Sequence, residues 1–237
     1  MIKKKLLKII PQKIIDFIRV KKIIYFDGYC TKSYAQEGED IVLNRFFKGK
    51  RNGFYVEVGC HHPFRFSNTN LFYNLGWRGI CIDPLPGTKS LFNKWRPKDI
   101  VLECGVSSVN GDLEYFMFNE PALNTFDCET AKLHDGLESY KIIQKRKIPV
   151  NTLTFLLDQY LPNDVINIDF FSIDVEGLDI EVLKSNNWIK YRPKLVIAES
   201  LYSELGMITS DPVSLYLKEL NYTPYAKTGN SVIYVNE

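Results

Sequence analysis

The sequence predicts an α/β fold in which a mostly parallel β-sheet carries helices on both faces and ends in an antiparallel strand. Short apolar runs rich in Val, Ile and Phe recur along the chain, and each ends in an acidic residue, a glycine or both. Segments suited to crossover helices separate these runs. Strands that alternate with helices are typical of a parallel sheet covered on both faces. The last apolar runs depart from the alternation and indicate the antiparallel ending.

Five of the runs have the composition of buried parallel strands, which are apolar on both faces. They are residues 53–59, 78–84, 99–106, 168–177 and 194–200. The predicted crossover helices are residues 67–77, 87–97, 178–188 and 211–220. Each helix follows a strand, which is the order that a parallel sheet requires.

The C-terminal residues 223–236 contain two β-rich runs around Lys227-Thr228-Gly229-Asn230, a composition typical of a hairpin. Residues 112–118 predict one extra strand. The stretch that follows, residues 119–147, is polar and weakly periodic. We expect it to form a variable loop or lid over the functional site.

Length and composition indicate one large domain. A chain of 237 residues with 45% hydrophobic content can build one full α/β core. We therefore expect a single domain over residues 33–237, preceded by a separate segment, residues 1–32. The formal net charge of +2 gives no overall field that would favour nucleic acid. The five cysteines form no CxxC pair and are expected to be reduced, as in a cytoplasmic protein: Cys30, Cys60, Cys81, Cys104 and Cys128.

The N-terminal segment has the pattern of a basic amphipathic helix interrupted near Pro11. It contains one acidic residue, Asp16, and eight basic residues: Lys3, Lys4, Lys5, Lys8, Lys13, Arg19, Lys21 and Lys22. Lysines interrupt its apolar positions, which argues against a secretory signal peptide, and no run approaches the roughly 20 apolar residues that span a bilayer. The segment is either a solvated arm or an interfacial helix that attracts anionic lipid. We expect a cytoplasmic protein, with peripheral association at the inner face of the membrane under the second interpretation.

Acidic residues and glycines gather at the predicted strand ends, where open parallel sheets bind ligands. These residues are Glu57 and Gly59, Asp83, Gly105 to Ser107, Asp174 and Glu176, and Glu199. The first turn, from Glu57 to Pro63, lacks the later glycines of GxGxxG, which disfavours a dinucleotide, and the chain has no GxxxxGK[ST] loop. After these exclusions, the type of ligand that remains is a nucleoside with ribose hydroxyls and no phosphates. S-adenosylmethionine matches that description.

Several strings in order carry a family resemblance. They are SYAQEGEDIVLNRFF, GFYVEVGCHHPFRFSNTNLFYNLGWRGICIDPLP, VNTLTFLLDQY, IDFFSIDVEGLDIEVL and RPKLVIAES. From about Ser33 to Ser200 the chain resembles the FkbM family of S-adenosylmethionine-dependent methyltransferases. The resemblance implies a Rossmann-like class I fold with a mostly parallel seven-stranded sheet and a final antiparallel strand. It also implies O-methylation of sugars, glycans or polyketides.

The resemblance assigns the cofactor site to particular residues. Glu57 and Gly59 would form the first cofactor motif, and Asp83 would accept both ribose hydroxyls. Further contacts would come from Val106 and Ser107 beside the adenine, from Gln36 and Glu39 at the methionine end, and from Asn68 and Asp174. For Asn68 and Thr69 the simpler interpretation is a helix cap.

Methyl transfer to a hydroxyl needs a base for the departing proton. Asp174 and Glu176 are the first candidates, and His62 is the alternative because imidazole titrates near neutral pH. A histidine before a proline is also a common turn residue. A second mechanism would use Mg²⁺ held by Asp174, Glu176 and Glu199.

The predicted function is transfer of a methyl group from S-adenosylmethionine to a hydroxyl of a sugar or glycan. The expected setting is biosynthesis of a bacterial capsule, O-antigen or other surface polysaccharide. The acceptor would be a sugar, a nucleotide sugar or a lipid-linked glycan, and no nucleic acid is expected. Two alternatives are a non-sugar acceptor, such as a polyketide, a peptide or a phosphate-like group, and a non-catalytic nucleoside-binding module.

Overall fold

The computed structural model describes residues 11–26, 31–200 and 205–236. Contacts divide the chain into two compact units, Met1–Ser33 and Tyr34–Glu237. The first unit contains helix α2, Gln12–Tyr25, which begins directly after Pro11. Residues 1–10, where the sequence predicts the first part of the basic helix, lie outside the described residues, as does Cys30.

The second unit is built on a seven-stranded sheet with the strand order β3-β2-β1-β7-β8-β10-β9. The strands are β1 Phe54–Val58, β2 Arg78–Ile82, β3 Ile100–Leu102, β7 Phe170–Ile173, β8 Leu195–Glu199, β9 Tyr222–Lys227 and β10 Ser231–Asn236. The first five pair in parallel, whereas β10 runs antiparallel to both β8 and β9. The predicted α/β fold with an antiparallel ending is therefore confirmed.

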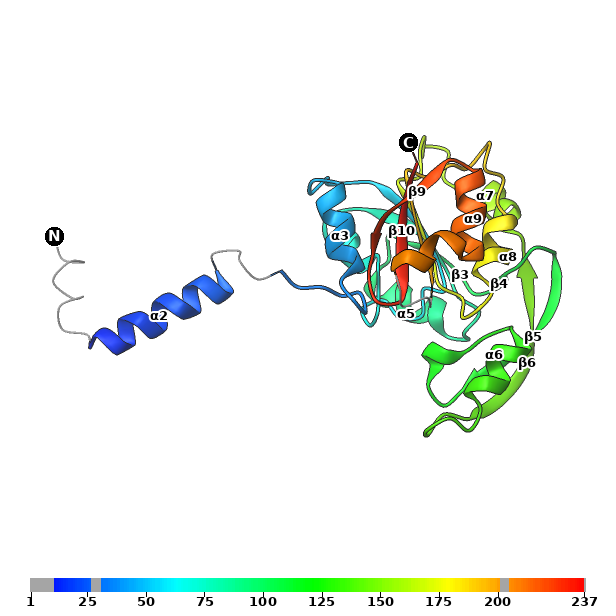
Figure 1. Ribbon diagram of the computed structural model, residues 1–237, viewed down its shortest axis with the longest axis horizontal. Coiled ribbons are helices and arrows are strands. Elements are labelled where there is room, and N and C mark those ends of the chain that lie inside the picture. Colours follow the sequence, from blue (N-terminus) through cyan, green and yellow to red (C-terminus); the bar gives the residue numbers. More distant parts are fainter. Residues whose placement is uncertain (1–10, 27–30, 201–204, 237) are drawn as a thin grey trace. The chain divides into compact units, whose positions relative to one another are not determined.

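Helices cover both faces of this sheet (Figure 1). One face packs against α7 Leu153–Tyr160, α8 Asp179–Lys184 and α9 Pro212–Glu219. The other packs against α3 Glu39–Phe46, α4 Asn70–Asn74 and α5 Thr88–Trp95. Strand β1 feeds both cores, because successive side chains point to opposite faces: Val56 enters the first core and Tyr55 the second. This double burial explains why the strands lack a polar face.

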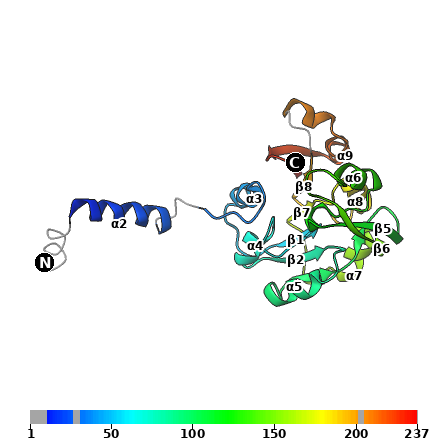
Figure 2. The ribbon, with the colours of Figure 1, turned by 90° about the horizontal axis from the view of Figure 1, so that it is seen from below.

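A second, three-stranded sheet has the order β4-β6-β5, and its long strands β5 and β6 lie side by side (Figure 2). Its strands are β4 Gly105–Val106, β5 Gly111–Phe118 and β6 Ile142–Asn151, and the short helices η1 Pro121–Leu123 and α6 Cys128–His134 connect β5 to β6. The interpretation of residues 119–147 as a loop was therefore wrong in part. Most side chains of β6 are exposed, so the apolar alternation that would reveal a strand is absent.

The single strand predicted at residues 99–106 forms two separate strands in the structure. Its first part, β3, joins the large sheet beside β2, and its second part, β4, pairs with β6. This division places Gly105 and Val106 where the two sheets meet. The remaining helix is η2 Leu205–Ser210, and no helix within the described ranges is long and apolar enough to cross a bilayer.

Candidate functional site

A first cavity lies beyond the carboxyl ends of the parallel strands, where open α/β sheets bind ligands. Its walls come from four strand ends and from the β5–α6 connection. The lining includes Val58, Gly59, Ile82, Asp83, Cys104, Gly105, Val106, Tyr115, Asn124, Thr125, Phe126, Asp174 and Glu176. The second sheet and its connections therefore close one side of the site that the large sheet begins.

Gly59 lets two backbone segments approach closely at the floor of this cavity. Its φ of +83° is a left-handed conformation, and a Cβ atom added there would lie 1.7 Å from the carbonyl oxygen of Asp174. Its own N–H donates to the carbonyl oxygen of Ile82 at 2.9 Å. Only glycine satisfies both the dihedral angle and the close approach.

Substitution of Gly59 by alanine is expected to unfold the protein or lower its melting temperature by many degrees, because the added methyl group overlaps the Asp174 backbone. The matched control is Gly87→Ala. Gly87 also has a positive φ, +97°, but its Cβ would meet no atom within 4 Å. The control isolates the cost of the left-handed angle, about 1 kcal/mol. Thermal denaturation of both variants checks the prediction, and equal losses would contradict it.

Asp83 lies at the end of β2 and is 6% exposed. Its Oδ2 accepts a hydrogen bond from the backbone N–H of His61 at 2.7 Å, and its Oδ1 accepts one from Leu85 at 2.8 Å. Burial raises the pKa of this carboxyl to about 6, although both backbone donors lower it. Each carboxylate oxygen keeps a further lone pair for a ligand hydroxyl. The structure thus offers the pair of acceptors that ribose hydroxyls need.

A second cavity of about 400 Å³ adjoins the first and shares Gln36, Phe66, Ala122, Asp174 and Glu176 with it. Its other walls include Glu37, Glu39, Arg65, Asn68, Glu120, His134, Tyr140 and Glu199. Arg65 is paired with Glu120 at 3.0 Å. In the described part of the chain no ion pair involves Asp174, Glu176 or Glu199. The carboxyls without an ion pair therefore dominate this cavity.

Burial and neighbouring carboxylates raise the pKa values of Glu199 and Glu176. Burial and the nearby Asp174 carboxylate raise the pKa of Glu199 to about 7. The same causes, with Asp174 and Glu199 as the neighbours, raise the pKa of Glu176 to about 9. Strongly raised carboxyl pKa values in a cavity are typical of groups that exchange protons with a ligand.

The backbone at Glu176 is strained as well. Its φ of +53° is unusual for a residue with a side chain. Its carbonyl oxygen accepts a hydrogen bond from Oγ1 of Thr125 at 2.8 Å, so the β5–α6 connection helps to hold this conformation. His61 and Phe66, which also line the site, have φ values of +45° and +56°. Strained residues of this kind cluster at functional sites.

The structure brings most of the predicted cofactor residues to the cavities. Gly59, Asp83 and Val106 line the first, Gln36 and Asp174 line both, and Glu39 and Asn68 line the second. Two of these side chains also form hydrogen bonds with other parts of the protein. Glu39 accepts from the Thr228 hydroxyl at 2.6 Å, and Asn68 donates to the Ser172 hydroxyl at 3.0 Å.

Three predicted residues lie outside both linings. Ser107 is buried, and its N–H donates to the carbonyl oxygen of Asn151. Glu57 is 4% exposed and accepts from the Thr69 hydroxyl at 2.5 Å, while burial raises its pKa to about 7. His62 Nδ1 accepts from two backbone N–H groups, those of Phe64 and Arg65, at 3.1 Å. In this geometry His62 holds a turn, because its accepting nitrogen is already occupied.

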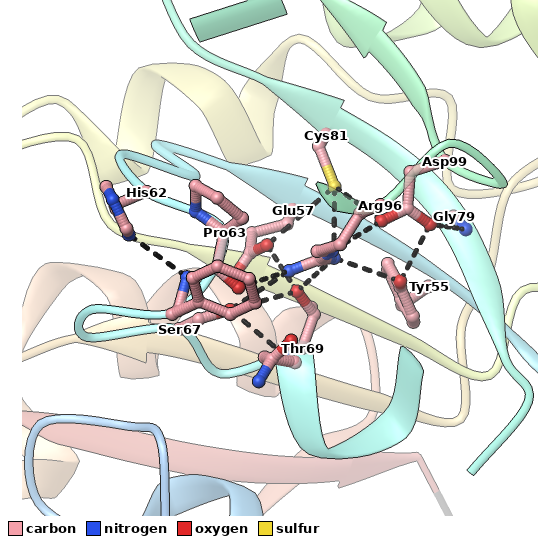
Figure 3. Close-up of polar contacts among 12 residues, drawn as sticks. Tyr55, Glu57, His62, Pro63, Ser67, Thr69, Gly79, Cys81, Arg96 and Asp99 are labelled. Atoms are coloured by element: carbon pink, nitrogen blue, oxygen red, sulfur yellow. Dashed lines mark hydrogen bonds and ion pairs between the residues drawn. The ribbon is translucent and has the colours of Figure 1, made fainter. Parts of the chain in front are cut away.

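The sequence analysis missed Arg96, the centre of a buried polar network (Figure 3). Its guanidinium is fully buried and pairs with Asp99 at 2.7 Å. It also donates to the hydroxyls of Thr69, Tyr55 and Ser67, at 2.8, 3.0 and 3.1 Å. Arg96 thereby fastens the segment after β1, which carries Phe66 and Asn68, to the sheet. An arginine before a proline at a helix end gives no signal of such a role.

The residues of the first cavity suit a nucleoside cofactor without phosphates. Asp83 supplies acceptors for two hydroxyls, Gly59 leaves room beside the backbone, and Val106 supplies an apolar wall. For Mg²⁺ the match is poorer. Over the ranges that the structure describes, no group of three or more His, Cys, Asp or Glu side chains is arranged to hold a metal ion.

Comparison with known proteins identifies the family. The model of the methyltransferase FkbM domain matches residues 57–224, which is well over half of the chain. No curated protein matches. Among solved structures, the C-terminal domain of precorrin-6Y C5,15-methyltransferase from Rhodobacter capsulatus is similar, with 11% identity and a TM-score of 0.42 over 89% of this chain and 91% of that one. On the strength of the family match, the chain belongs to the FkbM family and is an S-adenosylmethionine-dependent methyltransferase.

Proposed function

We propose that the chain methylates a hydroxyl group of a sugar or glycan, in the biosynthesis of a bacterial surface polysaccharide. The observation that carries the proposal is the second cavity, which joins the cofactor cavity at Asp174 and Glu176. Carboxyl groups accept hydrogen bonds from hydroxyls, and sugars offer several in a small volume. A cavity of about 400 Å³ has room for a group of that size.

The charge of the second cavity bears on the choice of acceptor. Those of its carboxyls that are ionised would repel a phosphate placed beside the reacting hydroxyl, and Arg65 is already paired with Glu120. The geometry therefore favours a neutral sugar unit over a phosphate-like acceptor. A nucleotide sugar or a lipid-linked glycan remains compatible when its phosphates lie outside the cavity.

The side chains of the protein hold the acceptor and take up its proton. S-adenosylmethionine, when bound, supplies a methyl group on a positively charged sulfur. We assign Asp174 to holding the acceptor hydroxyl at the junction of the cavities, and Glu176 to accepting the proton at a carboxylate oxygen. Alignment of this kind accounts for much of the rate of methyl transfer, and a positioned base adds about 10²–10⁴-fold.

The test is methyl transfer from isotopically labelled S-adenosylmethionine to a panel of acceptors. The panel contains neutral oligosaccharides, nucleotide sugars, lipid-linked glycans, hydroxylated polyketides and peptides. Transfer to sugar hydroxyls, seen as an O-methyl ether by mass spectrometry and NMR, would support the proposal. Transfer confined to the polyketide or peptide acceptors would overturn it.

A parallel set of reactions with EDTA tests the metal mechanism. The three carboxyls that the sequence analysis assigned to Mg²⁺ do line one cavity, so the assay decides between proton uptake and metal binding. Undiminished transfer in EDTA is expected if Glu176 acts as the base. Loss of transfer that added Mg²⁺ restores would assign Asp174, Glu176 and Glu199 to a metal instead.

Replacing Glu176 with glutamine is expected to lower kcat by about 10²–10⁴-fold and to leave cofactor affinity nearly unchanged. A base acts in its ionised form, and the pKa of Glu176 is raised to about 9. The wild-type rate should therefore rise with pH towards that value, and the variant should lose the rise. Glu129→Gln, in an exposed ion pair on α6, is the matched control. A variant that kept both the rate and the pH profile would exclude Glu176 as the base.

A further inference from the structure

Helix α2 exposes many apolar side chains and has no hydrophobic core of its own. Eight of its 14 residues are aliphatic or aromatic, yet none of the 14 is buried. Phe17 is 62% exposed, Ile18 is 55% exposed and Tyr25 is 66% exposed. Contiguous apolar surface of this kind marks a site of interaction with a protein or a membrane.

The apolar residues include a stripe along one side of the helix. Ile14, Phe17, Ile18 and Tyr25 occupy positions i, i+3, i+4 and i+11, which lie on one face of the helix, and Lys21 lies on the same face. The ammonium group of Lys21 lies 5.5 Å from the ring centroid of Phe17 and 5.2 Å from that of Tyr25. Lysine in such a position can bury its aliphatic part while its charge reaches the polar boundary.

The net charge of α2 indicates which kind of partner the helix binds. The helix contains four basic residues, Lys13, Arg19, Lys21 and Lys22, against Asp16, which gives a net charge of +3 from 4 − 1. A second copy of this helix would bring like charges together, whereas an anionic surface would attract them. The preceding residues add Lys3, Lys4, Lys5 and Lys8 to the same sequence segment.

We propose that α2 binds the surface of an anionic lipid bilayer and holds the methyltransferase unit at the membrane. Its apolar stripe would enter the boundary between headgroups and acyl chains, with its basic side chains beside the lipid phosphates. The helix lies on the bilayer and does not cross it, since it is neither long nor apolar enough. This inference rests on α2 alone and is independent of the acceptor.

The experiment is co-sedimentation of the full chain with vesicles. Vesicles of phosphatidylcholine alone are compared with vesicles that contain equal parts of phosphatidylcholine and phosphatidylglycerol, at low and high salt. We expect at least tenfold tighter binding to the anionic vesicles at low salt, and a loss of that preference at high salt, because salt screens exposed charges.

Two variants separate the contributions of α2. Phe17→Glu with Ile18→Glu disrupts the apolar stripe, and Lys21→Glu with Lys22→Glu reverses two charges; each pair should weaken binding at least tenfold. The matched control is Ile166→Glu with Ile189→Glu, which makes the same kind of change at residues 92% and 98% exposed on the other unit. The control should bind the vesicles like the wild type.

Three results would overturn the proposal: equal binding to both kinds of vesicle, wild-type binding by both α2 variants, or equal loss in the control. Sedimentation velocity without lipid tests the second copy as the occupant. A dimer that Phe17→Glu dissociates, together with no vesicle binding, would assign the stripe to self-association. Cofactor affinity, measured on each variant, should stay unchanged, so failure of lipid binding remains distinguishable from failure of the proposed function.

Discussion

Asp83→Asn is expected to weaken S-adenosylmethionine binding by at least about 100-fold. A hydrogen bond to a charged group contributes about 1.5–3 kcal/mol, and each 1.4 kcal/mol is a factor of ten in affinity. The side chain would lose the negative charge that strengthens its hydrogen bonds with both ribose hydroxyls. Its new amide N–H₂ would also face a backbone N–H, from His61 or Leu85, that now donates to it. Isothermal titration with S-adenosylmethionine and S-adenosylhomocysteine measures the loss.

The matched control is Glu103→Gln. This exposed side chain is close enough to influence the pKa of Asp83 and accepts from the backbone of Lys89, but it does not line the first cavity. The substitution removes one negative charge near Asp83 but changes no residue that lines the first cavity. The affinity for S-adenosylmethionine should therefore change less than about threefold. Equal losses in the two variants would show that general electrostatics, rather than Asp83, holds the cofactor.

The affinity of the wild type should also depend on pH. Burial raises the pKa of Asp83 to about 6, so the carboxyl takes up a proton as the pH falls through that value. The protonated form accepts ribose hydroxyls poorly. We therefore expect the Kd for S-adenosylhomocysteine to rise between pH 7 and pH 5, and Asp83→Asn to flatten the dependence over the same range.

Arg96→Met is expected to destabilise the fold by about 3–5 kcal/mol, the usual effect of removing one member of a buried ion pair. The side chains of Arg96 and Asp99 are both fully buried. Without the guanidinium, the Asp99 carboxylate would lose its counter-ion, and the hydroxyls of Thr69, Ser67 and Tyr55 would lose a donor. Chemical denaturation monitored by circular dichroism measures the free energy of unfolding.

Two comparisons sharpen this result. Arg78→Met breaks an exposed pair with Asp164, whose side chains are 40% and 72% exposed, and should cost at most about 1 kcal/mol. Arg96→Met combined with Asp99→Asn should recover part of the loss, because the uncompensated charge is then removed. A loss below about 1 kcal/mol in Arg96→Met would mean that the network does not support the segment from Pro63 to Thr69.

The sequence by itself determined the architecture of the large sheet, because the physical signals involved are local. Doubly buried strands such as Phe54–Val58 and Phe170–Ile173 must be apolar throughout, and their ends fall where the acids begin. The hairpin around Gly229 and the family resemblance from Ser33 to Ser200 could also be recognised, because they too depend on residues close together in the sequence. The candidate site followed from the rule that ligands bind at the carboxyl ends of parallel strands.

Only the tertiary structure decided how the acids at those ends are used. Glu57 lies inside β1, one residue before its end, and Asp83 directly follows the adjacent strand β2. Thr69 and Arg96 surround Glu57, whereas Asp83 lines the first cavity. Strand β6 was missed because most of its side chains are exposed, so the sequence carries no apolar alternation there. Arg96 was missed because the residues around it come from separate segments. Such contacts depend on which segments meet in space, and no local pattern of residue types records that.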